Sequence, residues 1–137
     1  MLFVVVVFFA AALALAFAAF NFAAVKKMPE GTERMSEIAA AIRVGANAFI
    51  NYEYRILAIV VACIAVLMAI ITTWHAAAAL LIGAVMSASA GFIGMKIATA
   101  SNCRTANACQ EGLNRGLRVA FSAGSVMGFT VVGLGML

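Results

Sequence analysis

Phosphate substrates are commonly bound together with metal ions, and carboxylate side chains hold those ions. This sequence has few carboxylates. All five acidic residues are Glu, Asp is absent, and every Glu lies outside the long apolar runs. Glu33 and Glu37 are one helical turn apart, whereas a magnesium site needs a shell rich in carboxylate oxygens. We therefore interpret this pair as a solvated helix face. We predict no catalytic, cofactor-binding or metal-binding residue in the chain.

Histidine and cysteine are not predicted to form a catalytic or metal site either. His75 is the only His and follows Trp74, a residue type that prefers the membrane interface, so we interpret His75 as interfacial and solvated rather than as a proton relay. Cys103 and Cys109 lie about 120° apart around a helix and cannot chelate one metal together. We expect both, and Cys63, to be reduced thiols. The sequence contains no Ser/His/Asp set, P-loop or dinucleotide fingerprint.

The amino-acid composition indicates the class of protein to which these residues belong. Hydrophobic residues make up 66% of the sequence and charged residues 10%, with a mean hydropathy of +1.13. Soluble domains are about one quarter charged. The chain is therefore expected to be a membrane protein.

The apolar runs predict an all-α fold, a polytopic bundle of four transmembrane helices. A bilayer core needs about 20 apolar residues per helix, so the long middle run is divided at the segment "TTWH", which predicts a very short turn. The first run has no basic residue before it and exceeds the length of a signal h-region, so we expect a retained helix rather than a cleaved leader. We expect a single membrane domain over residues 1–137, helices at about 2–25, 56–73, 76–95 and 119–137, and loops at about 26–55 and 96–118.

All nine basic residues fall in the two predicted loops. By the positive-inside rule these loops face the cytoplasm and the amino terminus lies outside, in a multi-pass protein of the cell (inner) membrane. The net charge of +4 then follows from topology. Membrane lipids are the expected surroundings, and no nucleic-acid partner is required.

The first loop is predicted to form an amphipathic helix running towards the membrane. Thr32 is the expected N-cap, with Glu33 in the first turn, where the helix dipole favours an acid. The polar face carries Glu and amides rather than Lys and Arg, so we expect the apolar stripe to pack on protein rather than on lipid. The stripe has steps of three or four residues and consists of Met35, Ile38, Ile42, Ala46 and Phe49.

The second loop is also predicted to be helical, over about residues 99–118, with its charges in water. Its polar side chains recur every three or four residues: Arg104, Asn107, Glu111, Asn114 and Arg118. Small residues spaced by four allow membrane helices to approach closely, so we expect packing at two further sets. These are Gly83, Ser87 and Gly91, and Gly124 and Gly128.

Three segments carry a family resemblance: "MSEIAAAIRVGANAFINYEY", "GMKIATASNCRTANA" and "AFSAGSVMGFTVVGLGML". Together they resemble the N-terminal part of the membrane-integral, ion-translocating pyrophosphatases, over residues 31–137. Tyr52 departs from the basic residue usual before "EY", and Cys103 and Cys109 depart from small or aliphatic residues. None of these positions is a known functional position of the family.

The resemblance implies a pump that hydrolyses cytoplasmic pyrophosphate and drives sodium or protons outward. It implies Mg2+ and K+ as cofactors of the full-length protein, a homodimer, and about sixteen helices, which need more than twice this length. The first four belong to an outer ring, whereas the aspartate-rich substrate site and ion gate lie further along the chain. The fragment alone is therefore expected to be inactive, with the remaining helices as its partners.

Other interpretations of the residues remain open beside the resemblance. One is a non-enzymatic membrane scaffold or assembly protein, for which the small-residue stripes would suffice. Another is a small four-helix transporter, although such proteins use an intramembrane carboxylate and the apolar runs contain none. Within the resemblance, "GMKIAT" and "GSVMG" look more like the potassium-stimulated branch, which favours sodium over protons as the transported ion.

Overall fold

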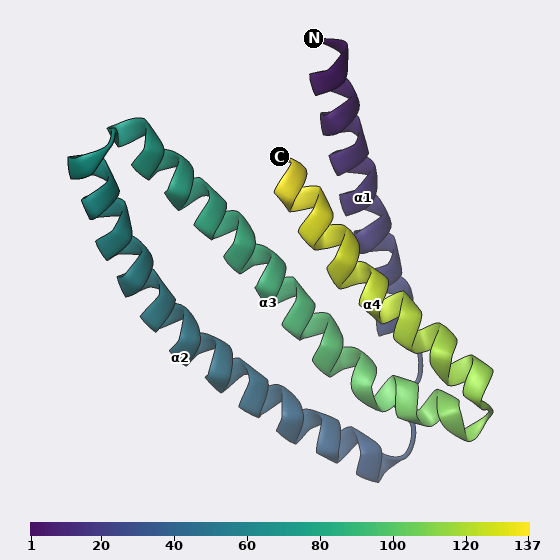
Figure 1. The fold of residues 1–137 in the computed structure, drawn as a ribbon. Helices are drawn as coiled ribbons and strands as arrows, with labels where there is room; N and C mark the ends of the chain where they lie inside the picture. Colours follow the sequence, from purple (N-terminus) through teal and green to yellow (C-terminus); the bar gives the residue numbers. More distant parts are fainter.

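The computed structural model describes residues 1–137 as four α-helices joined by short connections (Figure 1). All four are long and apolar enough to cross a membrane, which confirms the predicted all-helical, polytopic fold. They are α1 (Leu2–Lys26), α2 (Glu33–Ile71), α3 (Trp74–Gln110) and α4 (Leu113–Met136).

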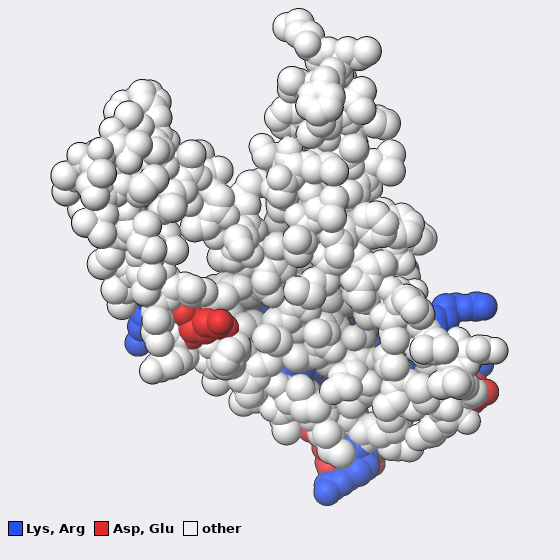
Figure 2. Space-filling view, viewed as in Figure 1, with Lys and Arg blue, Asp and Glu red and all other residues white.

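The helices lie in the spatial order α2, α3, α4, α1. Helix α3 packs on both α2 and α4, α1 packs on α4 and touches α3, and α1 makes no contact with α2. The four helices meet at the end that holds the α1–α2 and α3–α4 connections (Figure 1). Towards the other end the α2–α3 hairpin diverges from the α1–α4 pair, and Figure 2 shows the resulting cleft between two arms.

The two predicted polar loops are extensions of the long helices. Helix α2 runs without a break from Glu33 to Ile71, and α3 continues to Gln110. Thr32 caps α2 as predicted, because its hydroxyl accepts a hydrogen bond from the Met35 amide at 3.4 Å, and Glu33 occupies the first turn. The predicted "TTWH" turn is confirmed, with Thr73 capping α3 in the same way.

The remaining connections depend on two glycines. Gly112, between α3 and α4, has a φ of 139°, and Gly31, between α1 and α2, has a φ of 98°. Residues that carry a Cβ are strained at such positive φ angles, whereas glycine is not. The chain can therefore reverse within a few residues and bring the ends of all four helices together.

The buried core is small and lies where α1, α3 and α4 meet. Only 21 of 137 residues are buried, so most apolar side chains must face lipid or protein outside these residues. The central cluster consists of Ala18, Val25, Ile97, Ala123 and Val126.

Three of the five positions predicted to pack closely make no close contact within these residues. A Cβ added at Gly83, Gly124 or Gly128 would meet no atom within 4 Å. Gly91 does make a close approach, since an added Cβ would be 3.1 Å from the Tyr54 hydroxyl. Others lie at positions that the spacing did not indicate: at Gly133 an added Cβ would be 2.8 Å from Leu15 Cγ, and at Gly94 it would be 3.0 Å from Met127 Cγ. Spacing by four identifies a face that can pack closely, but not the neighbour that uses it.

The predicted packing stripe of the first polar segment is displaced around the helix. Ile38 and Phe49 are about half-exposed, whereas Ala39 and Ile50 are buried. The small Ala39 allows close packing, and neighbouring stripes on a helix differ by only one residue, so an apolar pattern alone does not fix which stripe is covered. The predicted stripe is not the face that α2 buries within these residues.

Candidate functional site

The strongest polar cluster of the molecule is built around Arg104 of α3. Its side chain is only 7% exposed. The guanidinium donates from Nε to the Met28 carbonyl at 2.8 Å and from Nη2 to the Lys26 carbonyl at 3.2 Å, while Nη1 donates to the Ala100 carbonyl. The last carbonyls of a helix have no partner within it, so Arg104 supplies donors to the carboxyl end of α1.

Glu30, in the α1–α2 connection, completes this cluster. One carboxylate oxygen lies 3.0 Å from Arg104 Nη2 and also pairs with Arg43 of α2. The other oxygen accepts a hydrogen bond from the Ser36 hydroxyl at 3.2 Å. We call Glu30, Ser36, Arg43 and Arg104 the arginine clasp, because it joins α2, α3 and the end of α1.

Burial raises the pKa of Glu30, but the partners reverse that effect. The hydrogen bond and charge of Arg43, the charge of Arg104 and the hydrogen bond of Ser36 together hold the pKa below its ordinary value of 4.5. The carboxylate is therefore ionised at neutral pH and neutralises part of the two guanidinium charges.

Arg104 corrects the prediction that every charge of the second polar segment stays in water. The local spacing placed it on the polar stripe of a solvated helix, but the Met28 and Lys26 carbonyls that it binds lie more than 70 residues earlier in the chain. A guanidinium offers five donors in a fixed plane and can satisfy several carbonyls at once. No local signal in the sequence identifies such a distant set of acceptors.

The two Glu residues in the first turns of α2 are exposed. Glu37 pairs with Arg34 at 3.0 Å, and both side chains are well exposed, at 61% and 82%. Glu33 is exposed in the first turn of the same helix. No group of three His, Cys, Asp or Glu side chains lies close enough together to hold a metal ion.

Histidine and the three cysteines are dispersed over the molecule. His75 is exposed at the α2–α3 turn, with its ring 3.9 Å from the Trp74 ring between centroids. Cys63 and Cys109 are exposed and Cys103 is buried, all as free thiols. The Cys103 thiol donates to the Met35 carbonyl at 3.1 Å, which makes it a packing group between α3 and α2.

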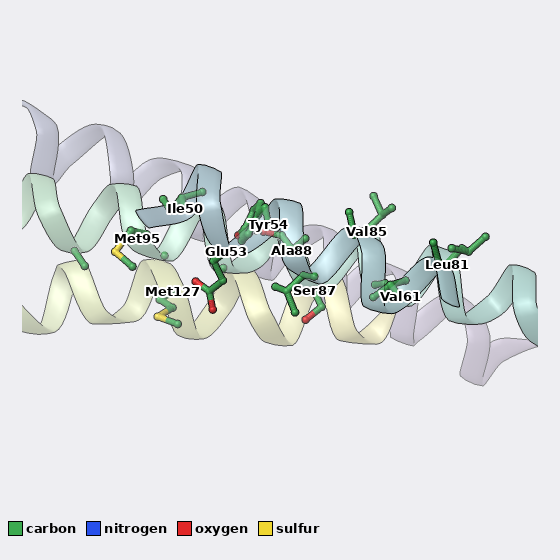
Figure 3. A pocket seen from close by; sticks show the side chains of 17 residues that line it. Ile50, Glu53, Tyr54, Val61, Leu81, Val85, Ser87, Ala88, Met95 and Met127 are labelled. Atoms are coloured by element: carbon green, nitrogen blue, oxygen red, sulfur yellow. Dashed lines mark hydrogen bonds between the residues drawn. The ribbon is translucent and has the colours of Figure 1, made fainter. Parts of the chain in front are cut away.

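A groove of about 850 Å³ lies between α2 and α3 and reaches α4 (Figure 3). The Tyr54 hydroxyl donates to the Ala88 carbonyl at 2.6 Å beside it and ties α2 to α3. The lining is apolar apart from a few groups, of which Glu53 is the only charged one. A carboxylate in an apolar groove repels anions, so this groove does not suit pyrophosphate.

These features define a class of protein: a multi-pass membrane helix bundle in which a cluster of charged side chains, the arginine clasp, joins the helices. The model of the family described as inorganic H+ pyrophosphatase matches residues 12–137. The chain belongs to this family of membrane pyrophosphate-energised ion pumps, which confirms the resemblance carried by the three segments.

Individual relatives agree with this assignment. The K(+)-stimulated pyrophosphate-energized sodium pump of Thermotoga maritima is 51% identical over 126 residues, covering 90% of this chain and 17% of the relative. The K(+)-insensitive pyrophosphate-energized proton pump of Methanosarcina mazei is 40% identical over 127 residues, covering 91% of this chain and 19% of the relative. The chain therefore spans less than a fifth of the length of either relative.

Proposed function

We propose that this chain is the N-terminal part of a pump that couples hydrolysis of cytoplasmic pyrophosphate to outward transport of sodium. The observation that carries this proposal is the 51% identity to a sodium pump named as K(+)-stimulated. A K(+)-insensitive proton pump of Moorella thermoacetica is 43% identical over the same number of residues. We therefore propose sodium as the ion and potassium as a stimulating cofactor, with protons as the alternative ion.

The contribution of these residues to that pump is structural. Magnesium bound to pyrophosphate would need free carboxylate oxygens, but both oxygens of Glu30 are engaged by arginine and serine side chains. Glu37 is paired with Arg34. The residues present do not fit a magnesium site, so we assign magnesium binding and hydrolysis to the rest of the pump.

Transport by a full-length protein carrying this chain tests the choice of ion. Purified protein in liposomes should take up radioactive sodium when pyrophosphate and magnesium are added outside, and potassium should increase the rate. An uncoupler that collapses proton gradients should leave sodium uptake intact if sodium is pumped directly. Acidification of the lumen in sodium-free buffer, without a requirement for potassium, would overturn the assignment in favour of protons.

We also propose that the clasp end of the bundle faces the cytoplasm, and that the pump is a homodimer in the cell membrane. Figure 2 supports the orientation, since Lys, Arg and Glu side chains gather towards that end and the outer parts of the two arms show none in this view. A bilayer separates a charged face from apolar spans in this way, and cytoplasmic loops carry the excess of Lys and Arg.

Thiol labelling of intact cells tests the orientation. In a background with Cys63, Cys103 and Cys109 replaced by Ser, single cysteines are placed at Thr73 and Asn114, both exposed. A membrane-impermeant maleimide should label Thr73→Cys from outside and label Asn114→Cys only after the cells are opened. The reverse pattern would contradict the proposed orientation.

A further inference from the structure

Four of the nine basic side chains have no partner within the molecule. Four arginines form ion pairs with Glu, and the Lys96 ammonium donates to the Asn47 amide oxygen at 2.7 Å. The positive-inside rule requires basic residues on one side of a membrane, but it does not require them to lack a carboxylate partner. The exposed cations without an ion pair or a side-chain hydrogen bond are Lys26, Lys27, Arg55 and Arg118.

Three of these cations lie at one level of the molecule, at the end of α1 and the start of α4. The two helices pack side by side in opposite directions, and the Phe17 and Phe129 rings meet at 4.9 Å between centroids. Lys26 follows Phe17 by nine residues and Arg118 precedes Phe129 by eleven. At 1.5 Å per residue both lie about 14 to 17 Å from this contact, towards the same end. Lys27 follows directly, with a helical backbone.

No carboxylate of the chain neutralises these three cations, which we call the basic rim. The Glu residues nearest to them in sequence are Glu30 and Glu111. Glu30 is engaged by Arg104 in the clasp, and Glu111 pairs with Arg115. The positive charge of the basic rim is therefore available to an anion from outside the chain.

Exposed aromatic side chains lie on the membrane side of the basic rim. Phe20 is 72% exposed and Phe121 is 76% exposed. Phe20 precedes Lys27 by seven residues, which is two turns, so the two share a face of α1. Phe121 follows Arg118 by three residues and lies on the next turn of α4. Each helix thus presents an apolar ring within its membrane span and a cation beyond it.

We propose that the basic rim binds the headgroups of anionic phospholipids, with their acyl chains against Phe20 and Phe121. Long Lys and Arg side chains at the end of a membrane helix extend to the level of the headgroups. Cations at this level attract anionic lipids. The proposal goes beyond the pump function and does not depend on which ion is transported.

A soluble anion is a weaker match to this surface than a lipid. Inorganic phosphate would meet the same cations, but it would gain nothing from the two exposed rings. A phospholipid has its phosphate and its apolar chains in the order in which the surface presents cations and rings. The basic rim therefore suits a lipid headgroup better than a phosphate free in solution.

Photolabelling of the full-length protein tests the proposal. The protein is placed in phosphatidylcholine nanodiscs with a small fraction of a probe lipid, which carries a diazirine on the acyl chain beside the headgroup. The probe is either phosphatidylglycerol or phosphatidylcholine. Peptic peptides are mapped by mass spectrometry, because pepsin does not depend on the basic residues that are to be replaced. The phosphatidylglycerol probe should label the peptides with Phe20 and Phe121 more strongly than the phosphatidylcholine probe.

Removing the charges of the basic rim should abolish this preference. A triple variant with Lys26→Gln, Lys27→Gln and Arg118→Gln should lose labelling by phosphatidylglycerol at least about five-fold, since each cation near a membrane surface contributes about that factor. Arg118→Lys keeps the charge and should keep the label. Gel filtration and circular dichroism check that each variant is folded.

A matched control removes the same charge elsewhere. Arg34 and Arg115 are exposed and paired with Glu, and Arg55 is exposed and unpaired on α2, which makes no contact with α1. Replacing these three by Gln should leave the labelling unchanged. An equal loss in this control would show that only the net charge matters, and would overturn the proposal.

Three further results would overturn it as well. Equal labelling by the two probes in the parent would mean that the surface does not select anionic lipids. Loss of the label when inorganic phosphate replaces chloride at equal ionic strength would assign the basic rim to a soluble anion. Absence of lipid label from both probes would show that protein covers the surface. The readout needs no pump activity, so failure of pyrophosphate-driven transport would reject the proposed function without changing this result.

Discussion

Arg104 shows how a single side chain can close the connection between two helices. The end of α1 leaves carbonyl groups without partners, and the guanidinium satisfies those of Lys26 and Met28 while its charge is balanced by Glu30. Each of these interactions needs the others, because a buried guanidinium without acceptors would be costly. The residue therefore has a structural role despite its position in a polar segment.

Replacing Arg104 should destabilise the protein far more than replacing an exposed arginine. Arg104→Met removes the donors for two carbonyls and one partner of Glu30, at a cost of about 2–3 kcal/mol. Arg115 pairs with Glu111, but both side chains are at least half-exposed, and such surface pairs contribute little. Thermal unfolding of both variants of the full-length protein, followed by circular dichroism, measures the difference. Equal melting temperatures for Arg104→Met and Arg115→Met would contradict a structural role for the clasp.

Glu30 makes the clasp sensitive to acid. The pKa of Glu30 is lower in the folded protein than its ordinary value of 4.5, so the unfolded chain binds the proton more readily. The stabilisation is complete above that value and is lost as pH falls through the lowered pKa. The melting temperature of the parent should therefore exceed that of Glu30→Gln near neutral pH, and the gap should shrink in acid. A gap that stays constant down to a pH of about 3 would show that the carboxylate charge contributes nothing.

At the scale of whole elements, α1 is held to α4 by a close approach at one glycine. Leu15 Cγ and the Ala11 carbonyl lie 2.8 and 3.3 Å from where a Gly133 Cβ would stand. One turn earlier the Phe17 and Phe129 rings meet edge to face at 4.9 Å between centroids. The α1–α4 contact therefore depends on the absence of a side chain at Gly133.

Gly133→Leu should separate α1 from α4. The added side chain overlaps Leu15, and overpacking of this kind costs about 1–3 kcal/mol. Gly135, half a turn away, has no atom within 4 Å of an added Cβ, so Gly135→Leu is a matched control. Melting of the full-length variants should show a loss for Gly133→Leu only. A comparable loss for Gly135→Leu would mean that the effect is not specific to the α1–α4 contact.

Patterns among neighbouring residues predict the helices and their caps. They do not predict the contacts between helices. The Thr32 cap and the "TTWH" turn depend on neighbours within four residues, and apolar run length fixed the number of helices. Arg104 and Gly133 could not be found in this way, since each acts on a residue of α1 or its loop that is far away in the sequence. The covered stripe of α2 was displaced for the same reason.

At the scale of the molecule, the four helices form a unit that is joined at one end and open at the other. The arginine clasp and the α3–α4 turn lie at the joined end, and the arms diverge towards the end with both termini (Figure 1). Few of the residues are buried within the chain. This arrangement is consistent with the proposed structural role of the chain in a larger pump.

The most direct test compares this chain with a full-length relative in liposomes. The 137-residue chain and the Thermotoga maritima sodium pump are reconstituted separately, and phosphate release and sodium uptake are measured after magnesium and pyrophosphate are added. The full-length pump should show both activities. The 137-residue chain, inserted to the same extent and helical by circular dichroism, should show neither, because it lacks the carboxylate shell that magnesium requires. Magnesium-dependent phosphate release by the chain alone, abolished when Glu33 and Glu37 are replaced by Gln, would contradict its assignment as a non-catalytic part of the pump.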